Sequence, residues 1–434
     1  MHIVAAILFA IVLGALIWFL KVFRKQGVKR IVFVSLFAIK LLAGISLYSI
    51  YTFYYDYEMS DIHKFYSGGK ALYEAADDNF ADYLRLVTGI QGDQPQLQKY
   101  YDNSEHWTRE FDYGLFNDNR TIMRFNAIVC LFSFGNIYIH IVLMAFLAFL
   151  GSFYLFRGVK GILKTKKAIL LVASFLIPSC LFWASGLLKE GLMMFAIGFA
   201  VYYLAKLYKK FNVFHLAGFA LSCALLFASK IYVLPAFLPA VVFFFIIKKM
   251  NVKYQLISFA AFLLISGVMV LYSGKIFGYD ILSTLSGKQN DFINYISLQE
   301  DPGSTYDLTR LSPEIAAFLK IVPEGLVNVF FRPFPTEINS AFMLFSFLEV
   351  MGFVILMIIP IFFFRKPSTE NLRYILFFTM FILFLYVVVG VYTPNTGSIV
   401  RYRIPALPFL FLVLTMITDW ERIGEKIKTI SFRK

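Results

Sequence analysis

Apolar runs of about 20 residues recur along the whole chain and restrict what it can fold into. A helix of that length crosses about 30 Å of hydrocarbon with its backbone groups satisfied internally. Charged residues make up 16% of the sequence, against roughly a quarter in a typical soluble domain. We therefore predict an all-α polytopic membrane protein, a single integral-membrane domain over residues 1–434. About eleven transmembrane helices are expected, at 3–20, 31–55, 136–156, 168–185, 187–205, 213–229, 231–247, 255–274, 341–364, 374–392 and 403–418.

The basic residues predict the orientation of these helices. Six short segments between or after the predicted spans hold 24 of the 41 Lys and Arg residues, and eleven spans place all six on one side. The positive-inside rule makes that side the cytoplasm, so the N-terminus is expected outside and the C-terminus in the cytoplasm. The membrane is predicted to be a bacterial inner membrane. The net charge of +14 then reflects topology and contact with anionic membrane lipids, not nucleic-acid binding. The segments are 21–30, 157–167, 206–210, 248–253, 365–373 and the tail after 419.

A long acidic stretch, residues 56–121, forms the first of two large loops on the predicted outer face. It carries 13 acidic residues and opens with apolar side chains at helical spacing over 60–74. Ser60 stands where it can cap the N-terminus of this helix, so we predict a juxtamembrane helix lying on the membrane. Gly68 and Gly69 either weaken this helix or let another backbone or a ligand approach closely.

The second outer loop, residues 275–335, contains another candidate interfacial helix. Ser312-Pro313-Glu314 is typical of a helix start, with Pro at the first helical position. An apolar stripe follows, and the prolines after Arg332 end the helix. The pattern therefore predicts a second helix at the membrane surface that carries Arg332 to the outer face.

A carboxylate beside several cations on one face suits group transfer from a phosphate ester. The carboxylate can accept a proton from an incoming hydroxyl, while Arg and Lys hold the phosphate and stabilise the departing charge. Asp61 is the candidate catalytic residue, and Asp56 or Glu58 at the same span end could replace it. The predicted substrate-binding residues on this face are His63, Tyr66, Lys189, Glu190, Lys230, Arg332, Arg401 and Arg403.

Structural roles compete with these assignments. Asp61 can be a first-turn carboxylate favoured by the helix dipole, a role that makes it a poorer base. Lys189 and Glu190 can form a structural pair that closes a tight turn. Arg401 and Arg403 can be snorkelling anchors of the last span. His63 can be an ordinary interfacial histidine.

The order of these features resembles the GT-C superfamily of membrane glycosyltransferases. The first element that carries the resemblance is S-D-I-H-K-F-Y at 60–66, followed by G-K-A-L at 69–72. R-F-N at 124–126, the turn I-P-S-C-L-F-W-A-S-G-L-L-K-E at 177–190 and R-Y-R-I-P-A-L-P at 401–408 are similar to later elements of the family. The chain differs from the family by an extra span before the acidic loop and by the lack of a second acid beside Asp61.

The resemblance implies an inverting transferase that takes a hexose or pentose from a polyprenyl-phosphate-linked donor. Asp61 would then be the base or a metal-associated carboxylate, and the cations would bind phosphate. The acceptor would be an envelope glycan or lipid, in polysaccharide biosynthesis. No cofactor is certain; a divalent metal is compatible with the family, with its ligands unknown.

A polysaccharide polymerase or ligase is the nearest alternative, and a transporter or flippase of lipid-linked glycans is another. A transporter usually places its polar residues near the bilayer midplane and often has repeated halves. Here polarity gathers on one face, which favours the enzyme. A non-catalytic membrane assembly partner would share the whole topology.

Overall fold

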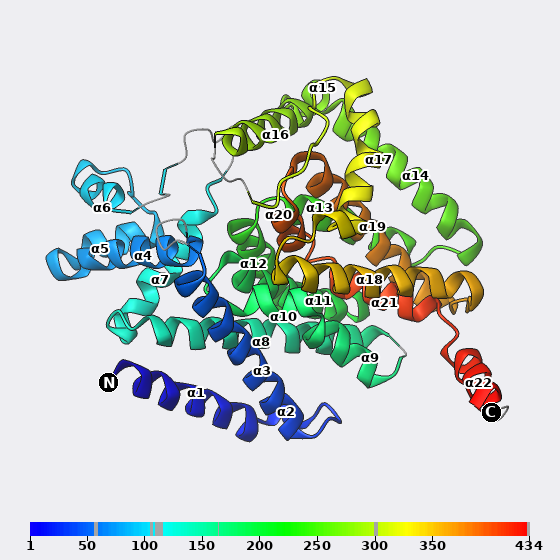
Figure 1. Ribbon diagram of the computed structural model, residues 1–434, viewed down its shortest axis with the longest axis horizontal. Helices are drawn as coiled ribbons and strands as arrows, with labels where there is room; N and C mark the ends of the chain where they lie inside the picture. Colours follow the sequence, from blue (N-terminus) through cyan, green and yellow to red (C-terminus); the bar gives the residue numbers. More distant parts are fainter. Residues whose placement is uncertain (56–59, 105–106, 109–115, 164, 299–302, 432–434) are drawn as a thin grey trace. The chain divides into compact units, whose positions relative to one another are not determined.

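The computed structural model describes the chain except residues 56–59, 105–106, 109–115, 164, 299–302 and 432–434. Every regular element in this described part is a helix (Figure 1). Two isolated β-bridges also occur there, Thr305 with Asn395 and Phe364 with Thr418. The predicted all-α class is confirmed.

Among the described residues, seven helices are long and apolar enough to cross a membrane. Two bent helix pairs raise the number to nine if each pair is one span, and α12 (Val213–Ser229) and α13 (Val233–Ile247) are shorter apolar helices. Each of the eleven predicted spans overlaps one of these helices or pairs, which confirms a multi-pass helical architecture; the count of eleven stays a prediction. The seven are α1 (His2–Phe19), α3 (Arg30–Phe53), α8 (Ile137–Ile162), α11 (Lys189–Lys209), α14 (Val252–Leu271), α18 (Ala341–Phe362) and α19 (Thr369–Tyr392).

Prolines mark both bent pairs. The first pair joins 167–176, which begins with α9 (Lys167–Leu171), to α10 (Pro178–Ser185) with a bend of 45°. The second joins α20 (Thr396–Tyr402) to α21 (Leu407–Ile417) with a bend of 71°. Pro178 and Pro408 stand in the first turns of α10 and α21, where a missing N–H costs nothing. Ile177, before Pro178, has an extended backbone.

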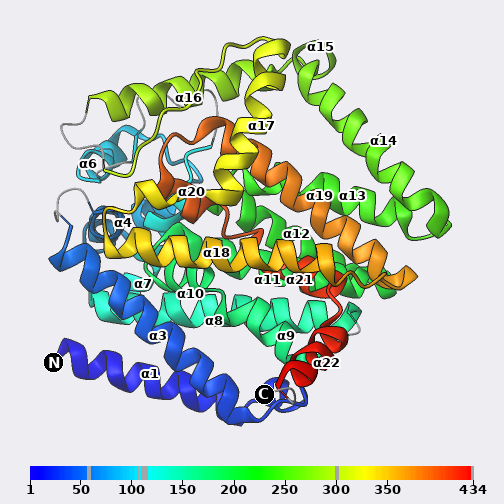
Figure 2. The ribbon, with the colours of Figure 1, turned by 45° about the vertical axis from the view of Figure 1, so that its right-hand side comes forward.

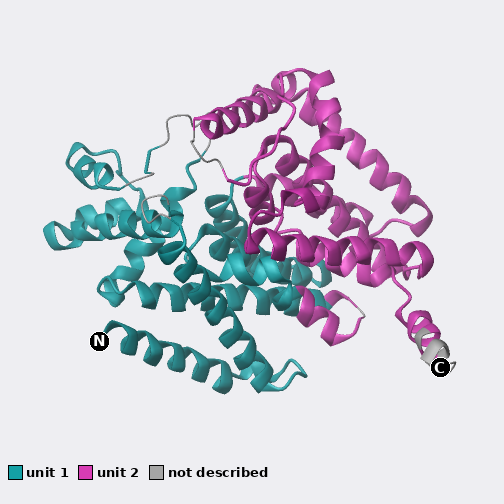
Figure 3. Cartoon of the chain, in the orientation of Figure 1, with its two compact units in different colours: residues 1–161, 174–231 teal, residues 162–173, 232–434 magenta. Residues whose placement is uncertain are grey.

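The chain divides into two compact units, coloured separately in Figure 3. Unit 1 holds residues 1–161 and 174–231, and unit 2 holds residues 162–173 and 232–434. The single domain over 1–434 stays a prediction, and each unit is described by itself.

Unit 1 is organised around the parallel helices α8 and α11. Gly151 lies directly against the backbone of Gly198, and a Cβ at Gly158 would lie 3.0 Å from the Cα of Tyr202. Small residues let helix backbones approach in this way. The 21 residues of α11 span about 30 Å. Its first turn carries Lys189 and its last turn carries Lys209, so these two side chains belong to opposite ends of the unit.

The predicted juxtamembrane helix is α4 (Asp61–Asp78), and it begins at the expected residue. Ser60 occupies the N-cap position, but its hydroxyl makes no capping bond. The helix continues through Gly68 and Gly69 because α7 (Asn119–Ser133) packs there: a Cβ at Gly69 would lie 2.7 Å from Met123 O. Gly69 therefore serves close backbone approach, one of the two predicted roles, whereas a Cβ at Gly68 would meet the side chains of Ser104 and Met123.

Two further helices pack against α4 in unit 1, α5 (Phe80–Thr88) and α6 (Gln98–Asp102). The short α2 (Lys21–Arg24) instead contacts α1 and α3. Asn79 caps α5, because its Oδ1 accepts a hydrogen bond from Ala81 N at 3.0 Å. The described part of the acidic loop is thus largely helical.

In unit 2 the chain turns from α14 through the short α15 (Ser273–Phe277) into α16 (Ile281–Ser297), as Figure 2 shows. The helix α16 was not expected from the sequence, although Asp280 caps it by accepting from Leu282 N at 2.9 Å. The unit ends with α22 (Trp420–Ser431).

The second predicted interfacial helix is α17 (Ile315–Phe331). It begins after Glu314, so the expectation that Pro313 occupies the first helical position is wrong. A Cβ at Gly325 would lie 2.8 Å from the carbonyl carbon of Gly390, which brings α17 into backbone contact with α19.

Candidate functional site

The first turn of α11 lies in a cluster of four buried charges, which we call the α11 charge cluster: Asp118, Lys189, Glu190 and Lys230. Lys189 Nζ donates to Asp118 Oδ1 at 2.9 Å and to Asn119 Oδ1 at 2.7 Å. Lys230 Nζ lies 3.1 Å from Glu190 Oε1. Burial of a charge is costly unless it is paired and hydrogen-bonded, and here two cations meet two carboxylates. The formal charges of the cluster cancel.

Helix ends explain why these residues meet. Asp118 precedes the N-terminus of α7 and Glu190 lies in the first turn of α11, where the helix dipole favours an anion. Lys230 follows the C-terminus of α12, where the dipole favours a cation. A hydrogen bond from Thr121 Oγ1 to Ala228 O, 2.7 Å long, holds the end of α12 against the start of α7.

Asp61 lies one helical turn before Phe65, the residue of α4 that contacts Lys189 of this cluster. It is the first residue of α4 and is half-buried. Lys189 Nζ lies 5.5 Å from the ring centroid of Phe65, and residues four apart share a helix face. The α11 charge cluster therefore borders the face of α4 on which Asp61 stands.

His63 faces α3 and is 4% exposed. Its Nε2 lies 3.1 Å from Thr52 Oγ1, and its ring lies 5.6 Å from that of Tyr48. Burial lowers the pKa of His63 below its ordinary value of 6.5. These contacts dock α4 on α3; substrate binding by His63 stays a prediction.

Tyr66 faces the beginning of α8. Its hydroxyl donates to Gly135 O at 2.7 Å, and its ring lies edge-on to His140 with centroids 5.2 Å apart. This hydrogen bond satisfies the phenol inside the protein. Substrate binding by Tyr66 likewise stays a prediction.

A buried polar chain behind Tyr66 was missed by the sequence analysis. Asn126 Nδ2 donates to Phe65 O at 3.0 Å, and Asn126 Oδ1 lies 2.9 Å from His140 Nδ1. The other ring nitrogen lies 2.8 Å from Ser133 Oγ. An ionisable residue inside an apolar segment is itself a signal of such a role, and His140 gave that signal. The chain connects the backbone of α4 to α7 and α8.

In unit 2, Arg403 is 2% exposed and caps the end of α17. Its Nη1 donates to Val329 O at 3.2 Å and to Arg332 O at 2.9 Å, carbonyls that no longer have partners within the helix. Its Nη2 lies 3.8 Å from Oε2 of Glu349 in α18. The snorkelling interpretation is therefore wrong for Arg403, which is buried within the protein.

Arg332 is held by three kinds of contact in the same unit. It forms an ion pair with Glu337, donates from Nε to Asn328 Oδ1 at 2.9 Å, and lies with its guanidinium carbon 3.7 Å from the ring centroid of Tyr306. Arg401 is half-buried in α20. The predicted convergence of these arginines with Asp61 at one outer mouth stays a prediction.

The described part of the chain contains no group of residues suited to binding a metal ion. There, no three His, Cys, Asp or Glu side chains come together in a way that could hold a metal ion. Asp56 and Glu58, the alternatives to Asp61, lie outside the described residues.

Comparison with known proteins finds no relatives. No family model matches the chain, and neither a curated protein nor a solved structure matches it. The resemblance to the GT-C superfamily therefore stays an expectation from the sequence.

Proposed function

We propose that this protein is a membrane glycosyltransferase acting on the outer face of the membrane. It moves a sugar from a polyprenyl-phosphate-linked donor to an envelope glycan or lipid acceptor. The observation that carries the proposal is the half-buried Asp61 at the start of α4, one turn from the residue that contacts Lys189. A carboxylate held beside a buried polar cluster, at the end of a long apolar helix, suits chemistry at the lipid–water boundary.

The proposed reaction is a direct displacement with inversion. The acceptor hydroxyl gives its proton to Asp61 as its oxygen bonds to the anomeric carbon. The bond from that carbon to the donor phosphate oxygen breaks, and polyprenyl phosphate leaves with the electron pair. Arginines of the predicted outer face stabilise the departing phosphate.

The α11 charge cluster positions the site in this proposal. In each of its two ion pairs the cation and the carboxylate neutralise each other, so the role of the cluster is to fix the start of α11 beside α4. Phosphate binding by the arginines stays a prediction from the sequence. Arg401 is the first of them to test, because replacing Arg403 would also uncap α17.

The test replaces Asp61 with Asn in the purified full-length protein. With a polyprenyl-phosphate-sugar donor in detergent, Asp61→Asn should lower the transfer rate by about 100-fold or more, the usual contribution of a general base. Asp77→Asn is the matched control, because Asp77 is exposed near the other end of the same helix. An unchanged thermal unfolding curve for both variants shows that they are folded.

Retention of transfer by Asp61→Asn would remove the proposed base. The length of the product separates a single-sugar transferase from a polymerase or ligase in the same assay. Movement of a lipid-linked glycan across proteoliposomes with no transfer would instead identify a flippase.

A further inference from the structure

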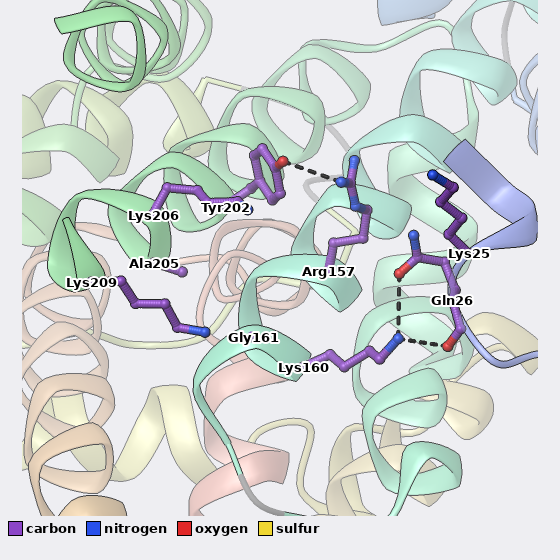
Figure 4. Close-up of a pocket in the computed structure, with 9 residues that line it drawn as sticks. All are labelled: Lys25, Gln26, Arg157, Lys160, Gly161, Tyr202, Ala205, Lys206 and Lys209. Carbon is purple, nitrogen blue, oxygen red and sulfur yellow. Dashed lines mark hydrogen bonds between the residues drawn. The ribbon is translucent and has the colours of Figure 1, made fainter. Parts of the chain in front are cut away.

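A basic pocket of about 320 Å³ lies at the other end of α11 from the α11 charge cluster. All of its lining residues belong to unit 1. Five of the nine are Lys or Arg, and none of these nine is acidic. Figure 4 shows their arrangement; the five cations are Lys25, Arg157, Lys160, Lys206 and Lys209.

The five cations come from three segments that are far apart in the sequence. Lys25 follows α2, Arg157 and Lys160 lie in the last turns of α8, and the other two lie in the last turn of α11. Like charges repel, so three helix ends that bring five cations to one hollow create a strongly positive potential there. An anion in the pocket would relieve that repulsion.

Two of the cations are already held in place by neutral groups. Arg157 Nη2 donates to the Tyr202 hydroxyl at 3.2 Å, and its guanidinium carbon lies 4.6 Å from the centroid of that ring. Lys160 Nζ donates to Gln26 O at 2.6 Å and lies 3.4 Å from Gln26 Oε1. Neither set of contacts neutralises a charge. A site ordered before binding loses less entropy when its ligand arrives.

The other three cations, Lys25, Lys206 and Lys209, line the same pocket. In Figure 4, Lys209 extends toward Gly161, whereas the ammonium group of Lys160 turns to Gln26 and the guanidinium of Arg157 turns to Tyr202. Gly161 contributes no side chain, and a Cβ there would lie 4.0 Å from Lys209 Nζ. The pocket lining thus combines lysine ammonium groups with the planar fork of an arginine, the donor types that bind the oxygens of a phosphate group.

We propose that this pocket binds a phosphate group, presented either by an anionic lipid headgroup or by a soluble phosphate compound. Its lining comes from three of the six basic segments that the positive-inside rule assigns to the cytoplasmic surface. Basic pockets between helix ends on that surface are suited to phosphate-bearing headgroups. The site lies at the opposite end of α11 from Asp61, so its binding test does not rest on the proposed transfer reaction.

The experiment measures binding to the full-length protein in neutral detergent by native mass spectrometry. The probes are phosphatidylglycerol, zwitterionic phosphatidylcholine and inorganic pyrophosphate. Phosphatidylglycerol should bind more tightly than phosphatidylcholine, and Lys209→Gln should weaken phosphatidylglycerol binding by about tenfold, the loss of one charge-assisted hydrogen bond. Lys210→Gln is the matched control: the residue is exposed next to Lys209 but does not line the pocket.

A second variant tests the geometry of the pocket. Arg157→Lys keeps the charge and removes the planar fork, so it should also weaken binding. Tight pyrophosphate binding that Lys209→Gln weakens, without preference for phosphatidylglycerol, would identify a soluble phosphate as the ligand. Equal binding of both lipids and of pyrophosphate to wild-type and Lys209→Gln protein would overturn the proposal.

Discussion

Lys189 reaches across 71 residues of sequence to Asp118, with 2.9 Å between Nζ and Oδ1, and each side chain is only 9% exposed. Asp118 closes the acidic loop, whereas Lys189 begins α11. The ion pair therefore fixes the end of the loop to a central helix of unit 1. Since α4 packs on α7 directly after Asp118, the same pair also helps to position Asp61.

Lys189→Met should destabilise the protein by roughly 3–5 kcal/mol, because it leaves the buried carboxylate of Asp118 without its cation. The double variant Asp118→Asn/Lys189→Met removes both charges and should recover part of the loss. Thermal unfolding in detergent measures both changes. A double variant that loses the full sum of the two single losses would show that the two side chains are not coupled.

Gly69→Ala should destabilise unit 1 by about 1–3 kcal/mol, since the new methyl group must push the backbone of α7 away from α4. A Cβ at this position would lie 2.7 Å from Met123 O. Gly14→Ala is the control, because a Cβ at Gly14 meets nothing within 4 Å. Equal unfolding temperatures for the two variants would contradict the close packing of α4 on α7.

His63 should make stability depend on pH. Burial lowers its pKa in the folded protein below 6.5, so the unfolded chain binds the proton at a higher pH than the folded protein does. Stability from this residue is therefore full above pH 6.5, falls as the pH drops below that value, and levels off below the folded pKa.

His63→Gln keeps a hydrogen-bonding group near Thr52 and removes the titration. The variant should lose less stability than wild-type protein when unfolding is followed from about pH 8 to about pH 5. All other ionisable groups are shared, so the difference between the two curves isolates His63. Curves that stay parallel would show that this residue does not titrate differently on folding.

Topology can be tested with single cysteines at exposed positions. Asp77→Cys should react with a membrane-impermeant maleimide in intact spheroplasts, whereas Lys210→Cys should react only after permeabilisation. The background is low because the native thiols Cys130, Cys180 and Cys223 are all buried. The reverse labelling pattern would invert the predicted orientation.

Local patterns allowed much of the fold to be predicted. The start of α4 at Asp61 follows from a capping position and from apolar residues at helical spacing, which are properties of neighbouring residues. The bends near Pro178 and Pro408 were not predicted, although both prolines stand inside predicted spans. The start of α17 was placed too early, because Pro313 is also compatible with the extended chain that precedes a helix.

The pairing of charges could not be predicted in the same way. Charge alone made Lys189 and Arg403 look like ligands for a phosphate, whereas their partners, Asp118 and the carbonyls at the end of α17, lie 70 or more residues away in sequence. Such pairing is decided by tertiary packing. The basic pocket shows the same limit: the segments of Lys25 and Lys160 were both assigned to one side of the membrane, but only the fold brings them to one hollow.

The contact of Gly151 with Gly198 has a mechanical consequence. Because the backbones of the two helices touch at these glycines, α11 cannot slide along α8 without losing this contact. The two ends of α11 therefore keep their positions relative to α8. A headgroup bound at Lys209 would then act as an anchor that sets the depth of the helix in the bilayer. The same anchor would set the position of Lys189 relative to the outer leaflet. The lipid composition of the cytoplasmic leaflet would then affect how deep the proposed transfer site lies in the outer leaflet.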